Sequence, residues 1–138
     1  MTAKLFADSN VVLYTIGKDA QKADIARRIV AGRPAVSAQV INECVSVCLR
    51  KLAFTRERAY EFARDRMDVL PLDESTIDQA GTLAVRYQLS HWDALIVASA
   101  LLAGCETLDT EDLQRGQLFD ERLRVINPFA DITEHNKE

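Results

Sequence analysis

The chain has 138 residues, 48% of them hydrophobic and 28% charged, and a formal net charge of −4. This composition is typical of one globular domain, and no apolar run reaches the roughly 20 residues that a membrane-spanning helix requires. The negative balance argues against a protein that binds nucleic acid with its whole surface.

Extended and helical patterns alternate from the first residues onward. Short apolar runs predict three buried strands, at residues 4–7, 35–37 and 68–72. Apolar residues at helical spacing predict three helices, at residues 19–31, 38–52 and 55–66. Gly32 and Pro34 are expected to end the first of these helices, and Thr55 is the expected N-cap of the third.

The same alternation continues to the end of the chain. Helices are predicted at residues 73–89 and 90–103, and strands at residues 105–108 and 123–126. Five strands that alternate with helices predict an α/β fold in which helices cover both faces of a parallel sheet. We expect a single domain over residues 1–130, followed by a polar, disordered tail over residues 131–138.

The three cysteines are odd in number, and each lies in an apolar segment. We interpret Cys44, Cys48 and Cys105 as reduced core thiols of a cytoplasmic protein, and the N-terminus lacks the pattern of a secretory signal. Cys44 and Cys48, four residues apart on one helix face, would supply half a zinc site. His91 and His135 are the only histidines, and no second pair completes such a site.

Acidic residues stand at the edges of the apolar segments. Asp8 ends the first predicted strand, and the carboxyl ends of strands are where open α/β sheets bind ligands. Glu43 lies three residues after Val40 and four before Val47, on the same helix face. A glutamate there would either serve a site or sit at the helix edge and point to water. The pattern leaves both interpretations open.

Two further acidic segments complete this set. Asp93 lies in the first turn of the apolar helix predicted at residues 90–103, where it either caps the helix or borders the sheet. After the fourth strand, Asp109, Glu111 and Asp112 are three acids within four residues, and the pattern does not decide which of them points inward. Thr110 lies among them and would cap a short helix or present its hydroxyl to the site.

A cluster of carboxylates points to a hard divalent cation. Mg²⁺ prefers oxygen ligands and often bridges carboxylates to a phosphate group, so hydrolysis of a phosphodiester is the expected chemistry. With Asp8, Glu43, Asp93 and Asp112 as ligands, such a site would hold one or two ions. The sequence carries no Ser-His-Asp or Cys-His set, P-loop or glycine-rich dinucleotide turn that would favour another chemistry.

Basic residues fall into two groups that are either phosphate contacts or solvated helix faces. The groups are Lys22, Arg27, Arg28 and Arg33, and then Arg50, Lys51, Arg56, Arg58, Arg64 and Arg66.

Four segments in the same order resemble the motifs of PIN-domain ribonucleases, and of the VapC-type toxins of bacterial toxin–antitoxin pairs in particular. The segments are residues 6–14, 37–43, 91–98 and 107–113. The resemblance implies a PIN-like three-layer sandwich with a five-stranded parallel sheet flanked by helices. It also implies an endoribonuclease that depends on Mg²⁺ or Mn²⁺, an RNA substrate, a homodimer and a cognate antitoxin that silences the enzyme.

The resemblance assigns the catalytic and metal-binding quartet to Asp8, Glu43, Asp93 and Asp112, with Asn10 and Thr110 in support. Asp112 is the most variable of these positions in the family, and Glu111 and Asp109 are the alternatives to it. Ser9 stands where threonine is common and keeps the hydroxyl.

Three other classes compete with this interpretation. A haloacid-dehalogenase-like phosphatase requires a second aspartate two residues after the first, where this chain has Asn10. A response-receiver domain requires a late lysine, but none lies between Lys51 and Lys137. The remaining alternative is a PIN-like module that binds RNA or an antitoxin without cutting.

Overall fold

A six-stranded sheet in the order β3-β2-β1-β4-β6-β5 runs through the computed structural model, which describes residues 4–65 and 67–135. The strands are β1 (Leu5–Ala7), β2 (Ala35–Ser37), β3 (Asp68–Leu70), β4 (Thr107–Asp109), β5 (Leu118–Phe119) and β6 (Leu123–Ile126). The pairs formed among β1, β2, β3, β4 and β6 are parallel, and β5 pairs with β6 in the antiparallel sense.

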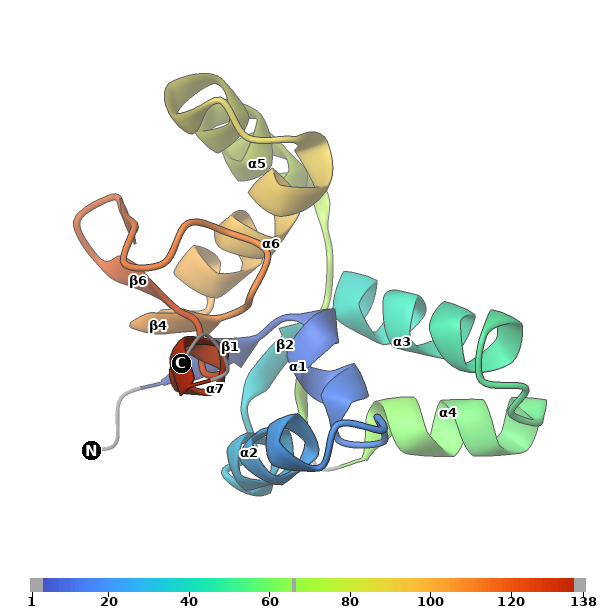
Figure 1. Cartoon of the computed structure of the whole chain (residues 1–138). Helices are drawn as coiled ribbons and strands as arrows, with labels where there is room; N and C mark the ends of the chain where they lie inside the picture. Colours follow the sequence, from blue (N-terminus) through green and yellow to red (C-terminus); the bar gives the residue numbers. More distant parts are fainter. Residues whose placement is uncertain (1–3, 66, 136–138) are drawn as a thin grey trace.

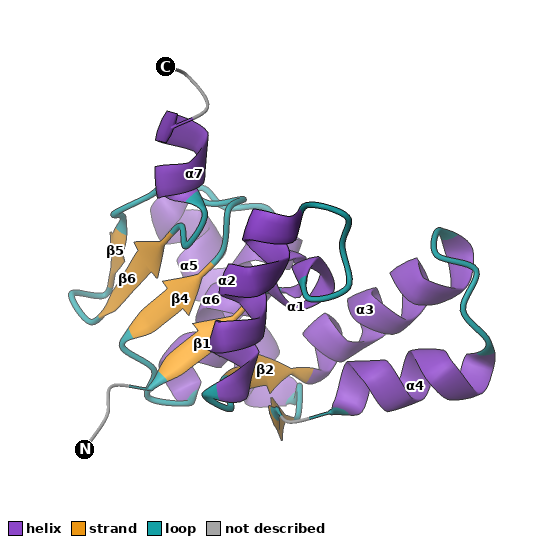
Figure 2. Cartoon of the chain, turned by 60° about the horizontal axis from the view of Figure 1, so that its bottom comes forward, coloured by secondary structure: helices purple, strands orange, loops and turns teal. Residues whose placement is uncertain are grey.

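Helices lie on both sides of this sheet. They are α1 (Ser9–Tyr14), α2 (Ala20–Ala31), α3 (Ala38–Arg50), α4 (Arg56–Arg64), α5 (Glu74–Tyr87), α6 (His91–Leu102) and α7 (Ala130–His135). The pair α5 and α6 lies on one side and the pair α1 and α2 on the other, while α3 and α4 project beyond the β2 end (Figures 1 and 2). The α/β three-layer fold expected from the sequence is confirmed.

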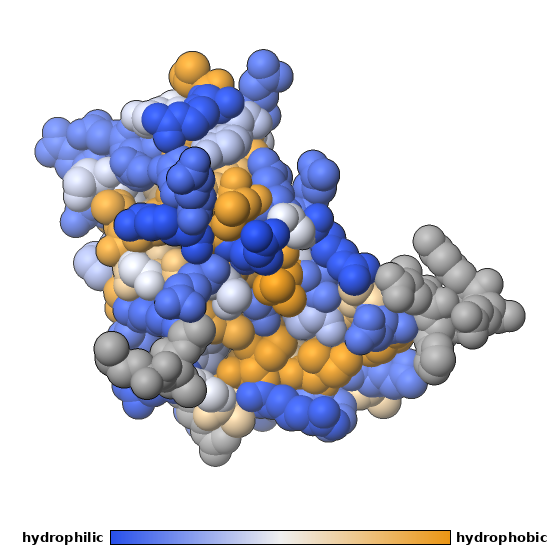
Figure 3. Space-filling view, turned by 90° about the vertical axis from the view of Figure 1, so that its left-hand side faces the viewer, coloured by the Kyte–Doolittle hydropathy of each residue, from blue (hydrophilic) through white to orange (hydrophobic). Residues whose placement is uncertain are grey.

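The five predicted parallel strands are all present, and the sheet has a sixth strand that the sequence did not predict. The additional strand, β5, has two residues and returns to β6 through Asp120 and Glu121, which both adopt positive φ. So short a strand carries no periodic signal in the sequence. Seen from the side of β6 and the chain ends, hydrophilic side chains cover the upper part and apolar side chains gather below (Figure 3).

Two short helices also depart from the expected pattern. The segment after β1 forms α1, with Asp8 as its N-cap. The first part of the tail predicted to be disordered forms α7, and residues 136–138 of that tail lie outside the described residues. The buried Phe129 precedes α7 and anchors the chain to the core, which brings the following residues into a helical turn.

Helix α6 forms the centre of the fold. Every residue from 94 to 101 is buried, as the uniformly apolar sequence of this helix predicts. Helix α3 buries only one face, with Val40, Cys44 and Cys48 fully inside, so its other face is free to line a groove. No helix within the described residues is long and apolar enough to span a membrane.

Candidate active site

The first expected acid, Asp8, lies where the strand order changes direction. From β1 the chain proceeds to β2 on one side, while β4 occupies the other side of β1. This point at the carboxyl ends of β1 and β4 is where open α/β sheets bind ligands. Asp8 follows β1 and Thr110 follows β4, and the Asp8 N–H donates to the Asp109 carbonyl oxygen at 3.0 Å.

The Asp8 carboxylate is held by two hydrogen bonds and is only 7% exposed. Its Oδ1 accepts from the Ser9 N–H at 2.7 Å, and its Oδ2 accepts from the Thr110 hydroxyl at 2.9 Å. Burial raises the pKa of Asp8 to about 6, against these two hydrogen bonds, and the charges of Glu43 and Asp112 add to the rise. Asp8 is thus a fixed, desolvated carboxylate beside two other acids.

Asn10 connects Asp8 to the acidic segment that follows β4. Its Nδ2 donates to Thr110 Oγ1 at 3.2 Å and to Asp112 Oδ2 at 3.0 Å. Thr110 Oγ1 also accepts from the Asp112 N–H at 3.1 Å. Asn10, Thr110 and Asp112 therefore form one hydrogen-bonded group around Asp8.

Of the three acids at the end of β4 and just beyond it, Asp112 is the one that joins this group. Glu111 is engaged elsewhere, because its carboxylate accepts from the Tyr14 hydroxyl and pairs with Lys22 at 3.2 Å. Asp109 is only 4% exposed on β4, and burial alone raises its pKa to about 6. The three-way ambiguity left by the sequence thus resolves, in geometry, in favour of Asp112.

Glu43 reaches the site from α3. Its Oε2 accepts from the Ser9 hydroxyl at 2.5 Å, and its Oε1 accepts from Gln39 Nε2 at 3.1 Å. The Glu43 side chain is half-buried at the border between the apolar face of α3 and solvent. Glu43 thus lies at the helix edge with its carboxylate turned to Ser9. That it serves a metal site stays a prediction.

Asp93, the remaining expected acid, lies on α6. It is half-buried in the first turn of α6, and its N–H donates to the N-cap hydroxyl of Ser90 at 3.1 Å. The charges of Glu43 and Asp112 contribute to the raised pKa of Asp8. The link to α6 runs through Gln39, whose Nε2 lies 3.5 Å from the Trp92 carbonyl oxygen.

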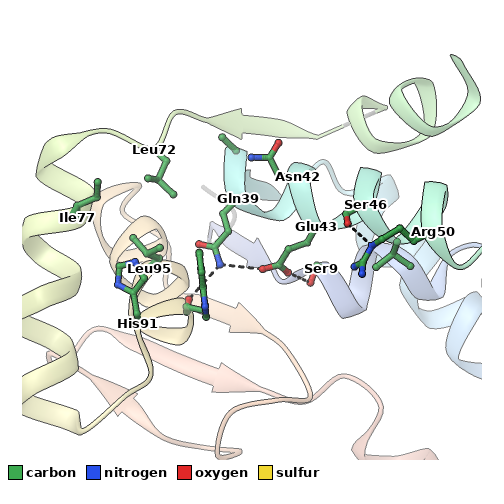
Figure 4. Close-up of a pocket in the computed structure, with 13 residues that line it drawn as sticks. Ser9, Gln39, Asn42, Glu43, Ser46, Arg50, Leu72, Ile77, His91 and Leu95 are labelled. Atoms are coloured by element: carbon green, nitrogen blue, oxygen red, sulfur yellow. Dashed lines mark hydrogen bonds between the residues drawn. The ribbon is translucent and has the colours of Figure 1, made fainter. Parts of the chain in front are cut away.

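An open groove of about 920 Å³ extends from Ser9 and Glu43 between α3 and the pair α5 and α6. Figure 4 shows Gln39 and Glu43 on one wall, joined by hydrogen bonds toward Ser9, with His91 and Leu95 on the opposite wall. The remaining lining residues are Ala38, Asn42, Ser46, Val47, Arg50, Leu72, Ile77 and Trp92. An extended ligand in this groove would end at the acidic group.

The donors around Asp8 suit a hard cation. No three acidic, histidine or cysteine side chains form a ready-made metal site within residues 4–65 and 67–135. Mg²⁺, however, usually keeps several waters and binds through one or two carboxylates. Asn10 Oδ1 and Gln39 Oε1 are buried without a hydrogen-bond partner in the described part of the chain, and a hydrated cation would satisfy such oxygens. The site therefore fits Mg²⁺ or Mn²⁺ held partly through water.

Two kinds of site residue were not anticipated from the sequence. Gln39 orients Glu43, and the signal for it was a polar residue one helical turn before Glu43 on a largely apolar helix. Lys22 was grouped with candidate phosphate contacts, but its ammonium pairs with Glu111. No local signal marks that pair, because its partners are 89 residues apart.

Three solved structures show how widely this fold recurs. A toxin–antitoxin complex from Klebsiella pneumoniae is 20% identical, with a TM-score of 0.68 over 91% of this chain and 98% of that one. DNA-bound VapBC from Salmonella typhimurium is 18% identical, with a TM-score of 0.68 over 92% and 99%. VapC20 from Mycobacterium tuberculosis, a sarcin-ricin loop cleaving toxin, is 19% identical, with a TM-score of 0.60 over 76% and 87%.

No curated protein matches the chain. At identities this low, the solved structures establish the fold alone. The family model of the PIN domain matches residues 5–131, which is nearly the whole chain and includes every segment described around Asp8. This chain belongs to the PIN domain family.

Proposed function

We propose that this protein is an endoribonuclease toxin that hydrolyses RNA phosphodiester bonds with Mg²⁺ or Mn²⁺ and is neutralised by a cognate antitoxin. The proposed metal-binding and catalytic residues are Asp8, Glu43, Asp93 and Asp112, with Asn10 and Thr110 in support. The observation that carries this proposal is the fixed, buried Asp8 carboxylate, which shares one hydrogen-bonded group with Asp112 and lies within the electrostatic reach of Glu43.

The residues of the chain have separate tasks in this proposal. The Ser9 N–H and the Thr110 hydroxyl fix the orientation of the Asp8 carboxylate, which is mostly ionised at pH 7 because its pKa is about 6. Asp8 and Asp112 would hold the ion from the ends of β1 and β4. Glu43 would complete the site from α3. A bound divalent ion supplies activation of water and stabilisation of charge on the phosphate.

Asp93 enters the proposal by position. It stands in the first turn of α6, directly after Trp92, which lines the same groove as Glu43 and whose carbonyl oxygen Gln39 approaches. The resemblance of residues 91–98 to a family motif supports the same role.

The partners follow from the known proteins that share the fold. VapC20 is a toxin that cleaves the sarcin-ricin loop, and the Klebsiella pneumoniae structure is a toxin–antitoxin complex. We infer an RNA substrate and an antitoxin partner for this chain as well. A homodimer belongs to the same proposal. Three free, buried cysteines support a cytoplasmic location.

A second candidate function is a module that binds RNA or an antitoxin without cutting. The absence of a ready-made metal site among the described residues favours it. The two candidates differ in one respect, because only the enzyme requires the Asp8 charge for its effect on RNA.

The test is cleavage of a structured RNA with Mg²⁺, with Mn²⁺ and with EDTA, by the wild type and by Asp8→Asn. We expect cutting that requires the metal and is lost in the variant, because one ligand is removed from a small set. Asp24→Asn is the matched control, since Asp24 is an exposed acid on α2 that pairs with Arg28 at 2.6 Å.

Cutting by Asp8→Asn at the wild-type rate, once contaminating nuclease has been excluded, would contradict the proposed site. Binding of RNA with equal affinity by both proteins, without cutting by either, would favour the non-catalytic module.

A further inference from the structure

A partly buried cluster of three polar side chains lies beside the acidic group. The Tyr14 hydroxyl donates to Glu111 Oε1, and Lys22 Nζ donates to the Tyr14 hydroxyl at 3.1 Å and to Glu111 Oε2 at 3.2 Å. The side chains of Lys22 and Glu111 are only 21% and 26% exposed. The Lys22 ammonium also lies 4.5 Å from the centre of the Tyr14 ring. This degree of burial sets the pair apart from a solvated surface ion pair.

The cluster holds the segment after β4 against two helices. Tyr14 ends α1, Lys22 belongs to the first turn of α2, and Glu111 lies in the segment that follows β4. Tyr14 also packs edge-on against the buried ring of Phe129, with 4.8 Å between the ring centres. The anchor of Glu111 is therefore itself fixed by the core.

Two side chains of helix α1 hydrogen-bond to adjacent residues of this segment. Asn10 and Tyr14 are four residues apart and lie on one face of α1. Asn10 donates to Asp112, while Tyr14 donates to the preceding residue, Glu111. The consecutive residues Glu111 and Asp112 thus each have a different hydrogen-bond donor on α1. These hydrogen bonds hold the two neighbouring carboxylates apart.

We propose that Tyr14, Lys22 and Glu111 form a positioning cluster. Tyr14 and Lys22 hold Glu111 against α1 and α2, so that Asp112 alone faces the Asp8 site. This inference rests on the proposed metal site and deepens it. None of the three residues touches the ion or the substrate in this scheme. They act by fixing the one ligand whose place the sequence leaves ambiguous. Partners that orient metal ligands commonly change metal affinity by about 10- to 100-fold when removed.

The experiment measures Mn²⁺ affinity by calorimetric titration in the absence of RNA. Three variants each remove one member of the cluster, Tyr14→Phe, Lys22→Met and Glu111→Gln. We expect each to weaken Mn²⁺ binding by about 3- to 10-fold, at or below the lower end of that range because the cluster acts one residue away from the ligand. Tyr14→Phe keeps the ring packed on Phe129, so it tests the hydrogen bond with the fold preserved. Asp24→Asn is the matched control on α2.

A general loss of structure is separated from positioning by a double-mutant cycle. In an Asp112→Asn background, Glu111→Gln should no longer change the residual Mn²⁺ affinity, since the ligand that the cluster positions is gone. An equal weakening in both backgrounds would overturn the proposal. Wild-type Mn²⁺ affinity in all three single variants would also overturn the proposal. If Asp8→Asn lost Mn²⁺ binding in the same assay, the proposed metal site would still stand. Wild-type Mn²⁺ binding by Asp8→Asn would instead refute the site itself.

Discussion

Removing the charge of Asp8 should make the protein more stable while it removes the proposed activity. Burial and two neighbouring acids raise the pKa of this carboxyl from its usual 3.8 to about 6. Folding therefore disfavours the charged form, and at pH 7.5 the native protein holds an ionised group in an unfavourable place. Asp8→Asn removes the charge and keeps nearly the same shape.

The magnitude follows from the size of the pKa change. At about 1.4 kcal/mol for each tenfold change in the acid dissociation constant, the ionised Asp8 costs about 3 kcal/mol of folding free energy at pH 7.5. The substitution disturbs one hydrogen bond, because the amide nitrogen replaces the oxygen that accepts from Thr110, at a cost of about 1 kcal/mol. We therefore expect Asp8→Asn to unfold with a free energy about 2 kcal/mol higher than that of the wild type.

The raised pKa of Asp8 also determines how the stability difference between the two proteins depends on pH. Because folding raises this pKa, the native state binds the proton more tightly, so the penalty is absent below 3.8 and grows as the pH rises through about 6. At pH 4.5 the penalty has fallen to about 1 kcal/mol, which the lost hydrogen bond offsets. The two proteins should then be about equally stable.

The assay is urea unfolding, followed by circular dichroism, at pH 7.5 and pH 4.5 with EDTA present. Asp24→Asn should differ from the wild type by less than about 0.5 kcal/mol at both values, since Asp24 is exposed. If Asp8→Asn exceeded the wild type in unfolding free energy by the same amount at both pH values, the charge of Asp8 would not be the cause. A less stable variant at pH 7.5 would refute the argument that Asp8 is a strained, desolvated carboxylate.

Three further outcomes follow from the same contacts. Asp109→Asn should also be more stable at pH 7.5 than at pH 4.5 relative to the wild type, because burial raises the pKa of Asp109 to about 6, and calorimetry should find its Mn²⁺ affinity retained. Mg²⁺ or Mn²⁺ should raise the melting temperature of the wild type, and the rise should be smaller when Asp8 and Asp93 are both replaced by asparagine; an equal rise would place the metal elsewhere. The buried thiols of Cys44 and Cys105, with pKa values raised to about 12 and about 11, should react with Ellman's reagent at pH 8 only after the protein is unfolded, and rapid labelling of the native protein would contradict their burial.

Local patterns in the sequence were enough to predict most of the fold. Alternating strand and helix signals gave the parallel sheet, and the uniformly apolar sequence of α6 predicted its place at the centre. These features depend on periodicity and capping, which are encoded within a few residues. Strand β5 and helices α1 and α7 were not predicted, because a strand of two residues and helices of six residues carry too little periodic signal.

The site divides in the same way. The sequence alone placed Asp8 after a strand and at the ligand-binding edge, and the structure has it there. That Asp8, Glu43, Asp93 and Asp112 bind metal stays a prediction. The choice among Asp109, Glu111 and Asp112 required the tertiary structure. After a strand ends, the direction of a side chain is no longer set by alternation but by the partners that meet it.

Those partners come from distant parts of the chain. Asn10 lies 102 residues from Asp112, and Lys22 lies 89 residues from Glu111. Neither pair leaves a spacing that a local pattern can reveal, because only the packing of α1 and α2 beside the end of β4 brings the partners together. The sequence by itself determined most of the strands and helices and placed Asp8 at the end of β1. The tertiary structure decided which acid each helix holds, since hydrogen bonds and ion pairs depend on proximity in space.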